Sequence, residues 1–227
     1  MKILAFDTAA TSCSVALMAG GELLAEATSF EKGTHARRLL PMIDALLKRE
    51  SVALAAIDGF ATTVGPGSFT GLRIGISTLK GLAAATGKPV AGLSTLEALA
   101  HQCTAEAENV CPLLDARKSE VYYCLYRRTA SGLEAMTEER NAPPSVAVGE
   151  VGSVCAFIGD GALLYRDRIE QSLGRKAIFA PREQNAIRAS TVAFLANRRF
   201  QSGEAADPFR LTPHYIRASD ALRAPRN

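Results

Sequence analysis

The chain has 227 residues, of which 48% are apolar and 22% are charged, and its formal net charge is +3. This length suits one large domain or two small lobes with a packed core, and the composition excludes wholesale disorder. A balance of 26 basic against 23 acidic residues is not the charge pattern of a strong nucleic-acid-binding protein.

The sequence also limits where the protein works. It contains no apolar run of about 18 residues, so we expect no membrane-spanning segment. Asp7 interrupts the first apolar run, which makes the N-terminus a poor signal peptide. The five cysteines are odd in number and form no CxxC pair, which predicts reduced thiols in a cytoplasmic protein and no zinc site.

The first half of the chain predicts alternating strands and helices. The predicted strands cover residues 2–8, 13–18, 23–28, 57–64 and 90–93, and the predicted helices cover 39–47, 69–85 and 96–103. Gly20-Gly21 between two strand candidates indicates a hairpin. Pro41 leaves two helix starts open, one near Leu40 and one near Thr34 with a kink.

A shorter echo of this pattern follows. The predicted strands cover residues 110–114, 121–126, 133–137 and 154–158, and the predicted helices cover about 162–173 and 185–201. Ala142-Pro143-Pro144 predicts a loop. We therefore expect two related α/β lobes, residues 1–108 and 109–227, with the helix near 185–203 packing back on the first lobe.

Three polar or glycine-rich turns are candidates for phosphate binding. An acid at a strand end and free N–H groups at a helix start are how many folds hold a cation and a phosphate. The candidate residues are Asp7, Thr8, Ser12, Gly65, Gly67, Gly159 and Gly161. The alternative is structural: Asp7 satisfies N–H groups of its own turn, and the glycines make tight turns. Neither glycine turn has the lysine of a Walker loop.

Two further features bear on partners and chemistry. The helix predicted over 69–85 is apolar on two faces, one through Gly71 and Gly75 and one through Leu72 and Ile76, so it has two packing partners. One of them is its own sheet, and the other is the helix of 39–47 or a second chain. The histidines stand alone in sequence, which argues against a metal site or a histidine-based catalytic pair.

Several strings of the sequence resemble the bacterial TsaB (YeaZ) family. The first are ILAFDTAATSCSVAL at 3–17, THARRLLPMIDALL at 34–47 and GPGSFTGLRIGISTLKGLA at 65–83. GLSTLEALA, LLDARKSEVYYCLY, FIGDGA and PHYIRAS follow at 92–100, 113–126, 157–162 and 213–219. The resemblance is dense over residues 1–128 and thinner afterwards.

The resemblance implies a two-lobed actin-like (ASKHA, ribonuclease H-like) α/β fold with a reduced second lobe. It also implies a non-catalytic scaffold that binds TsaD and helps recruit TsaE in forming threonylcarbamoyladenosine on tRNA, contacting tRNA only indirectly. The helices of 36–48 and 69–85 would meet TsaD, or a second copy in a homodimer. The implied partner-binding residues are Leu39, Leu40, Met42, Ile43, Leu46, Phe69, Leu72, Arg73, Ile76 and Leu79.

The same resemblance implies no resident metal or cofactor, with ATP or ADP at the contact with TsaD as the alternative. The catalytic relatives carry a His-x-x-x-His pair whose positions fall here on Thr95 and Leu99, and Leu99 cannot bind a metal. The rival function is a small nucleotide-dependent phosphotransferase or ATPase that uses Asp7. A protease is disfavoured, since Ser68 lacks the GxSxG setting of a hydrolase. The segment 210–227, with four arginines and one aspartate, is a basic tail that is either solvated or touches RNA.

Overall fold

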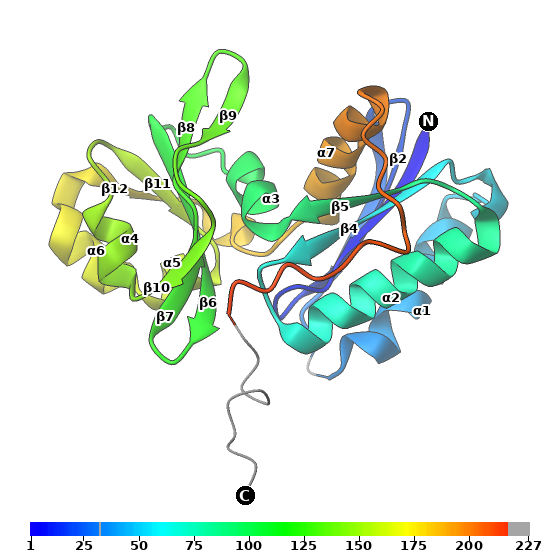
Figure 1. The fold of residues 1–227 in the computed structure, drawn as a ribbon, viewed down its shortest axis with the longest axis horizontal. Helices are drawn as coiled ribbons and strands as arrows, with labels where there is room; N and C mark the ends of the chain where they lie inside the picture. Colours follow the sequence, from blue (N-terminus) through cyan, green and yellow to red (C-terminus); the bar gives the residue numbers. More distant parts are fainter. Residues whose placement is uncertain (32, 218–227) are drawn as a thin grey trace, which may run out of the picture.

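The first lobe is built on a five-stranded sheet of order β3-β2-β1-β4-β5. The computed structural model describes residues 1–31 and 33–217 (Figure 1). The strands are β1 (Lys2–Asp7), β2 (Cys13–Ala19), β3 (Glu22–Ser29), β4 (Gly59–Gly65) and β5 (Val90–Ser94). The helices are α1 (His35–Arg49), the 3-10 turn η1 (Leu54–Ala56), α2 (Phe69–Thr86) and α3 (Thr95–Gln102). β1, β2 and β3 pair antiparallel, whereas β1, β4 and β5 run parallel.

Local sequence signals explain how these elements begin and end. Gly20 and Gly21 have φ of 60° and 89°, and the expected hairpin between β2 and β3 is confirmed. The earlier of the two starts left open for α1 is the observed one, since the helix begins at His35 and contains Pro41. The helix predicted over 69–85 is confirmed as α2: the Ser68 side chain accepts a hydrogen bond from the free Gly71 amide, and Gly87 ends the helix at φ 69°.

β1 is buried on both faces of the sheet, which accounts for its continuous apolar run. Leu4 and Phe6 pack against α1 and α2 in one core cluster. Ile3 and Ala5 point the other way, into a second cluster that contains residues of α7 (Ala189–Gln201). The sheet therefore lies between α1 and α2 on one face and α7 on the other (Figure 1).

The second lobe repeats the strand order of the first. Its sheet is ordered β10-β7-β6-β11-β12, with β8 pairing β6 and β9. The strands are β6 (Asn109–Arg117), β7 (Glu120–Tyr123), β8 (Tyr126–Thr129), β9 (Gly132–Ala135), β10 (Arg140–Ala142), β11 (Cys155–Ile158) and β12 (Ala177–Phe179). The helices are α4 (Pro144–Gly149), α5 (Asp160–Leu164) and α6 (Arg166–Leu173), and the 3-10 turns are η2 (Gly174–Lys176) and η3 (Arg182–Gln184).

Several details of the second half of the chain differ from the expectation. The single helix predicted over about 162–173 is divided into α5 and α6, and the helix predicted over 185–201 begins at Ala189. The apolar run 121–126, predicted as one strand, is divided between β7 and β8, because the chain leaves β7 after Tyr123 and returns to pair with β6. The predicted loop at 142–144 is instead the end of β10 and the first turn of α4. Pro144 is the first residue of that helix, where its missing N–H group costs nothing.

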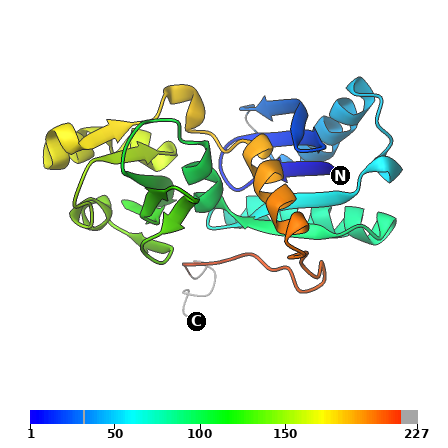
Figure 2. The same ribbon diagram turned by 90° about the horizontal axis from the view of Figure 1, so that it is seen from above.

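Two helices connect the lobes. α3 packs against β6 of the second lobe as well as β4 and β5 of the first, and its apolar residues belong to a core cluster shared by both lobes. α7 follows the second lobe in sequence but packs on β1, β2 and β5, so the chain returns to the first lobe (Figure 2). After α7 the chain runs along the first lobe to Arg217, and residues 218–227, with two of the four tail arginines, lie outside the described part. No helix in the described residues has the length and apolar character needed to cross a membrane.

Candidate functional site

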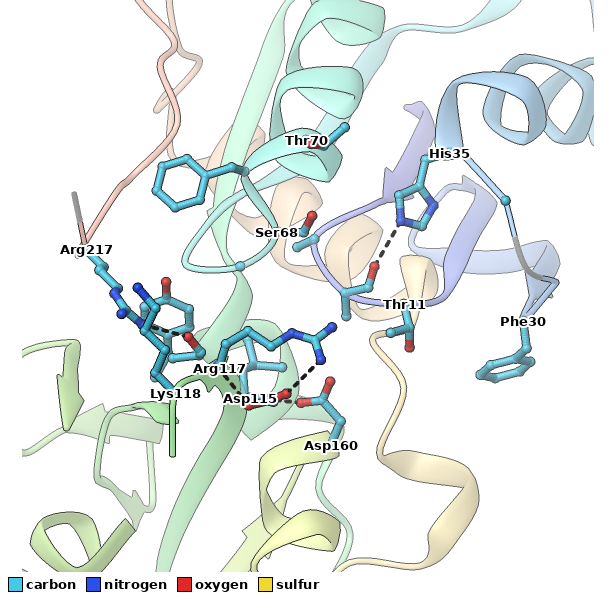
Figure 3. A pocket seen from close by; sticks show the side chains of 18 of the residues that line it. Thr11, Phe30, His35, Ser68, Thr70, Asp115, Arg117, Lys118, Asp160 and Arg217 are labelled. Carbon is cyan, nitrogen blue, oxygen red and sulfur yellow. Dashed lines mark hydrogen bonds and ion pairs between the residues drawn. The ribbon is translucent and has the colours of Figure 1, made fainter. Parts of the chain in front are cut away.

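A cleft of about 660 Å³ lies between the two lobes. The first lobe contributes the turn after β1, the first turn of α1 and the first turn of α2. The second lobe contributes the turn between β6 and β7 and the start of α5, and Arg217 comes from the C-terminal segment (Figure 3). The cleft is therefore lined by turns and helix starts from both halves of the chain.

Backbone atoms of the β1–β2 turn fill the space beside the glycines at the start of α2. A Cβ atom at Gly67 would meet the carbonyl oxygen of Ala9, and one at Gly71 would meet the carbonyl oxygen of Thr8. The Ser68 amide donates to the Ala9 carbonyl at 2.7 Å, which ties the two turns together. These glycines allow the helix to sit on the β1–β2 turn, so the structural interpretation of the GPGSFTG turn accounts for them.

The acid predicted to hold a cation lies behind this contact. Asp7 is fully buried; its Oδ1 accepts hydrogen bonds from the Thr63 hydroxyl and the Ala9 amide. Burial raises the pKa of Asp7 to about 7, and the Thr63 hydrogen bond opposes that shift. Thr8 and Ser12 are buried too, and the Thr8 hydroxyl donates to the Gly71 carbonyl at 2.8 Å. None of these three residues lines the cleft in the structure.

The second glycine turn behaves in the same way, with one exception. Gly159 and Gly161 are buried against the backbone at Leu113, and the Gly159 amide donates to the Asn185 side chain at 2.8 Å. The exception is Asp160, which faces the cleft and accepts the Asp115 amide at 2.9 Å. Of the seven residues predicted for phosphate binding, only Gly67 lines the cleft. Asp7, Thr8, Ser12, Gly65, Gly159 and Gly161 are buried, and their role in binding a nucleotide stays a prediction.

The charged wall of the cleft was not predicted. It consists mainly of Arg117, the last residue of β6, and Lys118, which follows it, with Arg217 beside them (Figure 3). Arg38 lines the cleft from α1. Arg117, Lys118 and Ser119 have φ of 61°, 53° and 60°, a left-handed run without glycine. The Ala-Arg-Lys-Ser string after a strand was the available signal, but the fold is needed to bring it opposite α2.

His35 and Arg38 form the outer rim of the cleft. His35 Nε2 donates to the Ala10 carbonyl at 2.9 Å, and its Nδ1 accepts from Arg38 at 3.2 Å. Burial lowers the pKa of His35, which keeps the ring neutral in this arrangement. Arg38 also donates to the Glu31 carbonyl at 2.5 Å and to the Gly33 carbonyl at 3.3 Å, so its side chain holds the segment that precedes α1.

The remaining reactive side chains are not arranged for metal or thiol chemistry. Within residues 1–31 and 33–217, no group of three or more His, Cys, Asp or Glu side chains is placed to hold a metal ion. All five cysteines are buried and unpaired. Burial raises the pKa of the Cys13 thiol to about 11, and the pKa of Cys103 and Cys124 rises for the same reason, which disfavours the reactive thiolate.

The structure divides the ten residues predicted for partner binding into three groups. Six of them lie in the chain's own core: Leu39, Ile43, Leu46, Leu72, Ile76 and Leu79. A side chain packed inside its own lobe offers a partner no surface, and a partner-binding role for those six stays a prediction. Leu40 is 53% exposed and Met42 is half-buried. Phe69 stacks on Tyr215 with ring centroids 4.5 Å apart, and Arg73 Nε donates to the Tyr215 hydroxyl at 2.9 Å.

The fold and the cleft define the class of protein. The two lobes have the same strand order, and α3 packs between them. This arrangement is an actin-like (ASKHA, ribonuclease H-like) fold, as expected from the sequence. The ROK hexokinase of Thermus thermophilus has this fold: it is 14% identical, the TM-score is 0.50, and the match covers 88% of this chain and all of the hexokinase. At that identity the likeness shows the fold alone.

Closer relatives define the family. Residues 29–224 match the family model described as TsaD, tRNA N6-adenosine threonylcarbamoyltransferase. The tRNA threonylcarbamoyladenosine biosynthesis protein TsaB of Bacillus subtilis is 32% identical over 97% of this chain and 96% of its own length. The crystal structure of YeaZ from Pseudomonas aeruginosa matches with a TM-score of 0.82 and 35% identity, over 94% of this chain and 99% of that one. The chain belongs to the TsaB (YeaZ) family, within the wider family described by the TsaD model.

Proposed function

We propose that this chain is a non-catalytic scaffold subunit of the cytoplasmic assembly that forms threonylcarbamoyladenosine on tRNA. In this proposal it binds TsaD through its first lobe, helps recruit TsaE, and meets tRNA only through its partners. Membership of the TsaB family supports the pathway, because relatives are named for the biosynthesis of that nucleoside. The same surface would mediate self-association of the isolated chain.

The observation that carries the scaffold assignment is the burial of the residues that chemistry would need. Asp7 lies beneath the contact between α2 and the β1–β2 turn, where Gly71 fits against Thr8. Thr95 and Leu99 occupy the positions at which the catalytic relatives carry histidines, and both are completely buried. These residues are committed to packing this chain, which favours a structural role in the complex.

The exposed side of α1 and α2 is the surface that remains for a partner. The two helices pack side by side on one face of the first sheet (Figure 1). Their exposed residues follow helical spacing: Leu40, Pro41, Asp44, Ala45 and Lys48 on α1, and Arg73, Ser77, Gly81 and Ala84 on α2. Small residues at the centre of this surface allow a partner helix to approach closely, and Leu40 supplies an apolar anchor.

Gly81 gives a direct test of this surface. A Cβ atom there meets nothing within 4 Å, so Gly81→Arg adds a long charged side chain to the surface without disturbing the core. The matched control is Gly149→Arg on α4, where a Cβ atom also meets nothing. We expect the wild type and Gly149→Arg to form a complex with TsaD in size-exclusion chromatography and calorimetry, and Gly81→Arg to bind at least about tenfold more weakly.

Each result of this experiment is decisive. Failure of the wild-type chain to associate with TsaD at about 50 µM would overturn the scaffold proposal, since a standard interface binds more tightly. Association of Gly81→Arg with wild-type affinity would overturn the proposed surface but leave the scaffold role intact. Size-exclusion chromatography of each variant alone tests self-association through the same helices.

The second candidate is nucleotide binding or turnover, favoured by the cationic wall of the cleft. Arg117 and Lys118 face the start of α2 across a space large enough for a nucleotide, about 660 Å³. Such a ligand would use the cleft of this chain or a contact with TsaD nearby. ATP hydrolysis by the isolated chain that disappears in Arg117→Ala would support an ATPase, whereas absence of turnover in the wild type contradicts it.

A further inference from the structure

The last described segment, residues 207–217, crosses from the first lobe to the second. We call it the strap. It follows α7 after residues 202–206, passes β5 and α2, and ends between the lobes (Figure 1). Just before the strap, the Ala206 amide donates to the Val90 carbonyl at 2.8 Å on the edge strand β5. A Cβ atom at Gly92 of β5 would collide with Leu211, so the strap lies directly on this edge.

The strap is attached firmly to the first lobe. The His214 amide donates to the Val64 carbonyl at 2.7 Å, and Gly65 leaves room for the His214 backbone. Tyr215 then stacks on Phe69 and accepts the hydrogen bond from Arg73. Backbone pairing, an aromatic stack and a side-chain hydrogen bond together anchor this part of the strap to β4 and α2.

The end of the strap contacts the second lobe through side chains. His214 Nε2 lies 3.5 Å from a carboxylate oxygen of Glu139. Arg217 Nη1 donates to the Ala116 carbonyl at 3.0 Å and lies 3.3 Å from Glu120 Oε2. The Arg217 side chain is only 12% exposed, so its charge is enclosed by these two groups rather than by water.

Arg217 contacts the second lobe at both ends of the turn between β6 and β7. Ala116 and Glu120 are the residues on either side of the left-handed run at 117–119, which forms the cationic wall of the cleft. Left-handed residues other than glycine persist only where their surroundings hold them. One guanidinium that binds both ends of the run supplies such a constraint.

We propose that residues 207–217 form a latch that sets the angle between the lobes, with Arg217 as the residue that holds the second lobe. The chain crosses covalently between the lobes after α3 and before α7. The strap adds non-covalent contacts to those that α3 makes with β6 and that Ser94 makes with Glu139. A connection of this kind can open and close without breaking the fold of either lobe. When the latch is closed, it fixes both the width of the cleft and the conformation of its cationic wall. This inference does not depend on the proposed function.

Distances between the lobes test the latch. Spin labels at Glu22→Cys and Ser131→Cys report on exposed outer hairpins of the first and second lobes, and the five native cysteines are buried. The test variant is Arg217→Ala. Its matched control is Arg210→Ala, which removes an arginine of the same strap whose side chain is 90% exposed and forms an ion pair with Asp207.

We expect Arg217→Ala to widen the distribution of interlobe distances about twofold and to speed amide exchange over residues 116–120 about tenfold. Arg210→Ala should match the wild type in both measurements. Identical results for the two variants would overturn the latch. If Arg217→Ala fails to fold, Glu120→Gln removes the charge partner of Arg217 within a β-strand, and an unchanged distance distribution in that variant overturns the proposal equally.

Discussion

Each lobe has an acidic residue near the end of its central strand, and the two acids meet different surroundings. β1 ends at Asp7 and leads by a short turn into β2, while Asp115 near the end of β6 precedes the turn into β7. Asp7 is fully buried, whereas the Asp115 side chain is 16% exposed and lines the cleft. Two turns in equivalent places of the strand order therefore present one acid to the core and the other to a site.

The crossover helix that covers each turn accounts for the difference. In the first lobe α2 spans 18 residues, and its glycines at 71 and 75 let it press directly on Thr8. In the second lobe α5 spans five residues, and its own acid, Asp160, is directed into the cleft. Strand order alone therefore does not place a strand-end acid in a site. Whether the acid is buried or reaches the cleft depends on how closely the following helix packs against the turn.

The largest expected effect concerns the buried acid. The pKa of Asp7 is raised by burial from 3.8 to about 7, so the folded protein binds this proton more tightly than the unfolded chain. The stabilisation from protonated Asp7 is complete below about pH 4 and is lost as pH rises through about 7. Because the pKa of Asp7 differs by about three between the folded and unfolded states, the free energy of unfolding falls by about 4 kcal/mol over this range. Asp7→Asn should remove this slope in urea-unfolding free energies measured from pH 4 to pH 8.

Thr63 provides the control for that experiment. Its hydroxyl donates to Asp7 and favours the charged carboxylate, so Thr63→Val should move the midpoint of the pH dependence upward. A slope that persists in Asp7→Asn would show that another group causes it, and the contrast between the two turns would lose its electrostatic basis.

The second prediction concerns the close contact between Gly71 of α2 and Thr8, which covers Asp7. In Gly71→Ala the new methyl group would meet the Thr8 carbonyl oxygen at less than van der Waals distance, and backbone atoms cannot swing aside. We expect a loss of about 3 kcal/mol in the free energy of unfolding. Gly81→Ala in the same helix meets only open space, and it should gain about 0.5–1 kcal/mol through helix propensity. Equal effects of the two substitutions in chemical denaturation would contradict the close contact.

The smallest expected effect concerns Ser119, in the turn between β6 and β7 of the second lobe. Ser119 is exposed and has φ of 60°, a conformation that glycine adopts without steric cost. Ser119→Gly should therefore raise the free energy of unfolding by about 1 kcal/mol. The exposed Ser131→Gly in the β8–β9 turn is the control, since Ser131 does not have a positive φ. A destabilised Ser119→Gly chain would mean that the serine side chain, and not its backbone, matters at this turn.

Much of the fold followed from local patterns in the sequence. The β2–β3 hairpin at Gly20-Gly21 and the extent of α2 were predicted because turn glycines and helix caps act over a few residues. The prediction was wrong where a tertiary partner decided the outcome. The run 121–126 has the composition of one strand, but pairing of Tyr126 with Val110 bends the chain into a second one.

The candidate site was predicted less well than the fold, for a related reason. Residue types identified Asp7 and the glycine turns, but not whether a ligand or the chain's own backbone occupies the space beside them. Arg117 and Lys118 stand in the family string 113–126, but nothing in it indicated a cleft, and they line one only because the second lobe is folded opposite α2. The same holds for Leu72 and Ile76, whose apolar side chains were equally compatible with a core and with a partner surface.

The sequence by itself determined the family, the α/β class and the positions of most elements, because these depend on periodicity, capping and motifs that lie close together along the chain. The tertiary structure decided which polar residues reach the cleft, which helix residues remain exposed, and where Arg217 makes its contact, 97 residues from its charge partner Glu120. Burial and long-range contact are properties of the packed chain, set by how closely helices approach sheets, and a local pattern does not contain them.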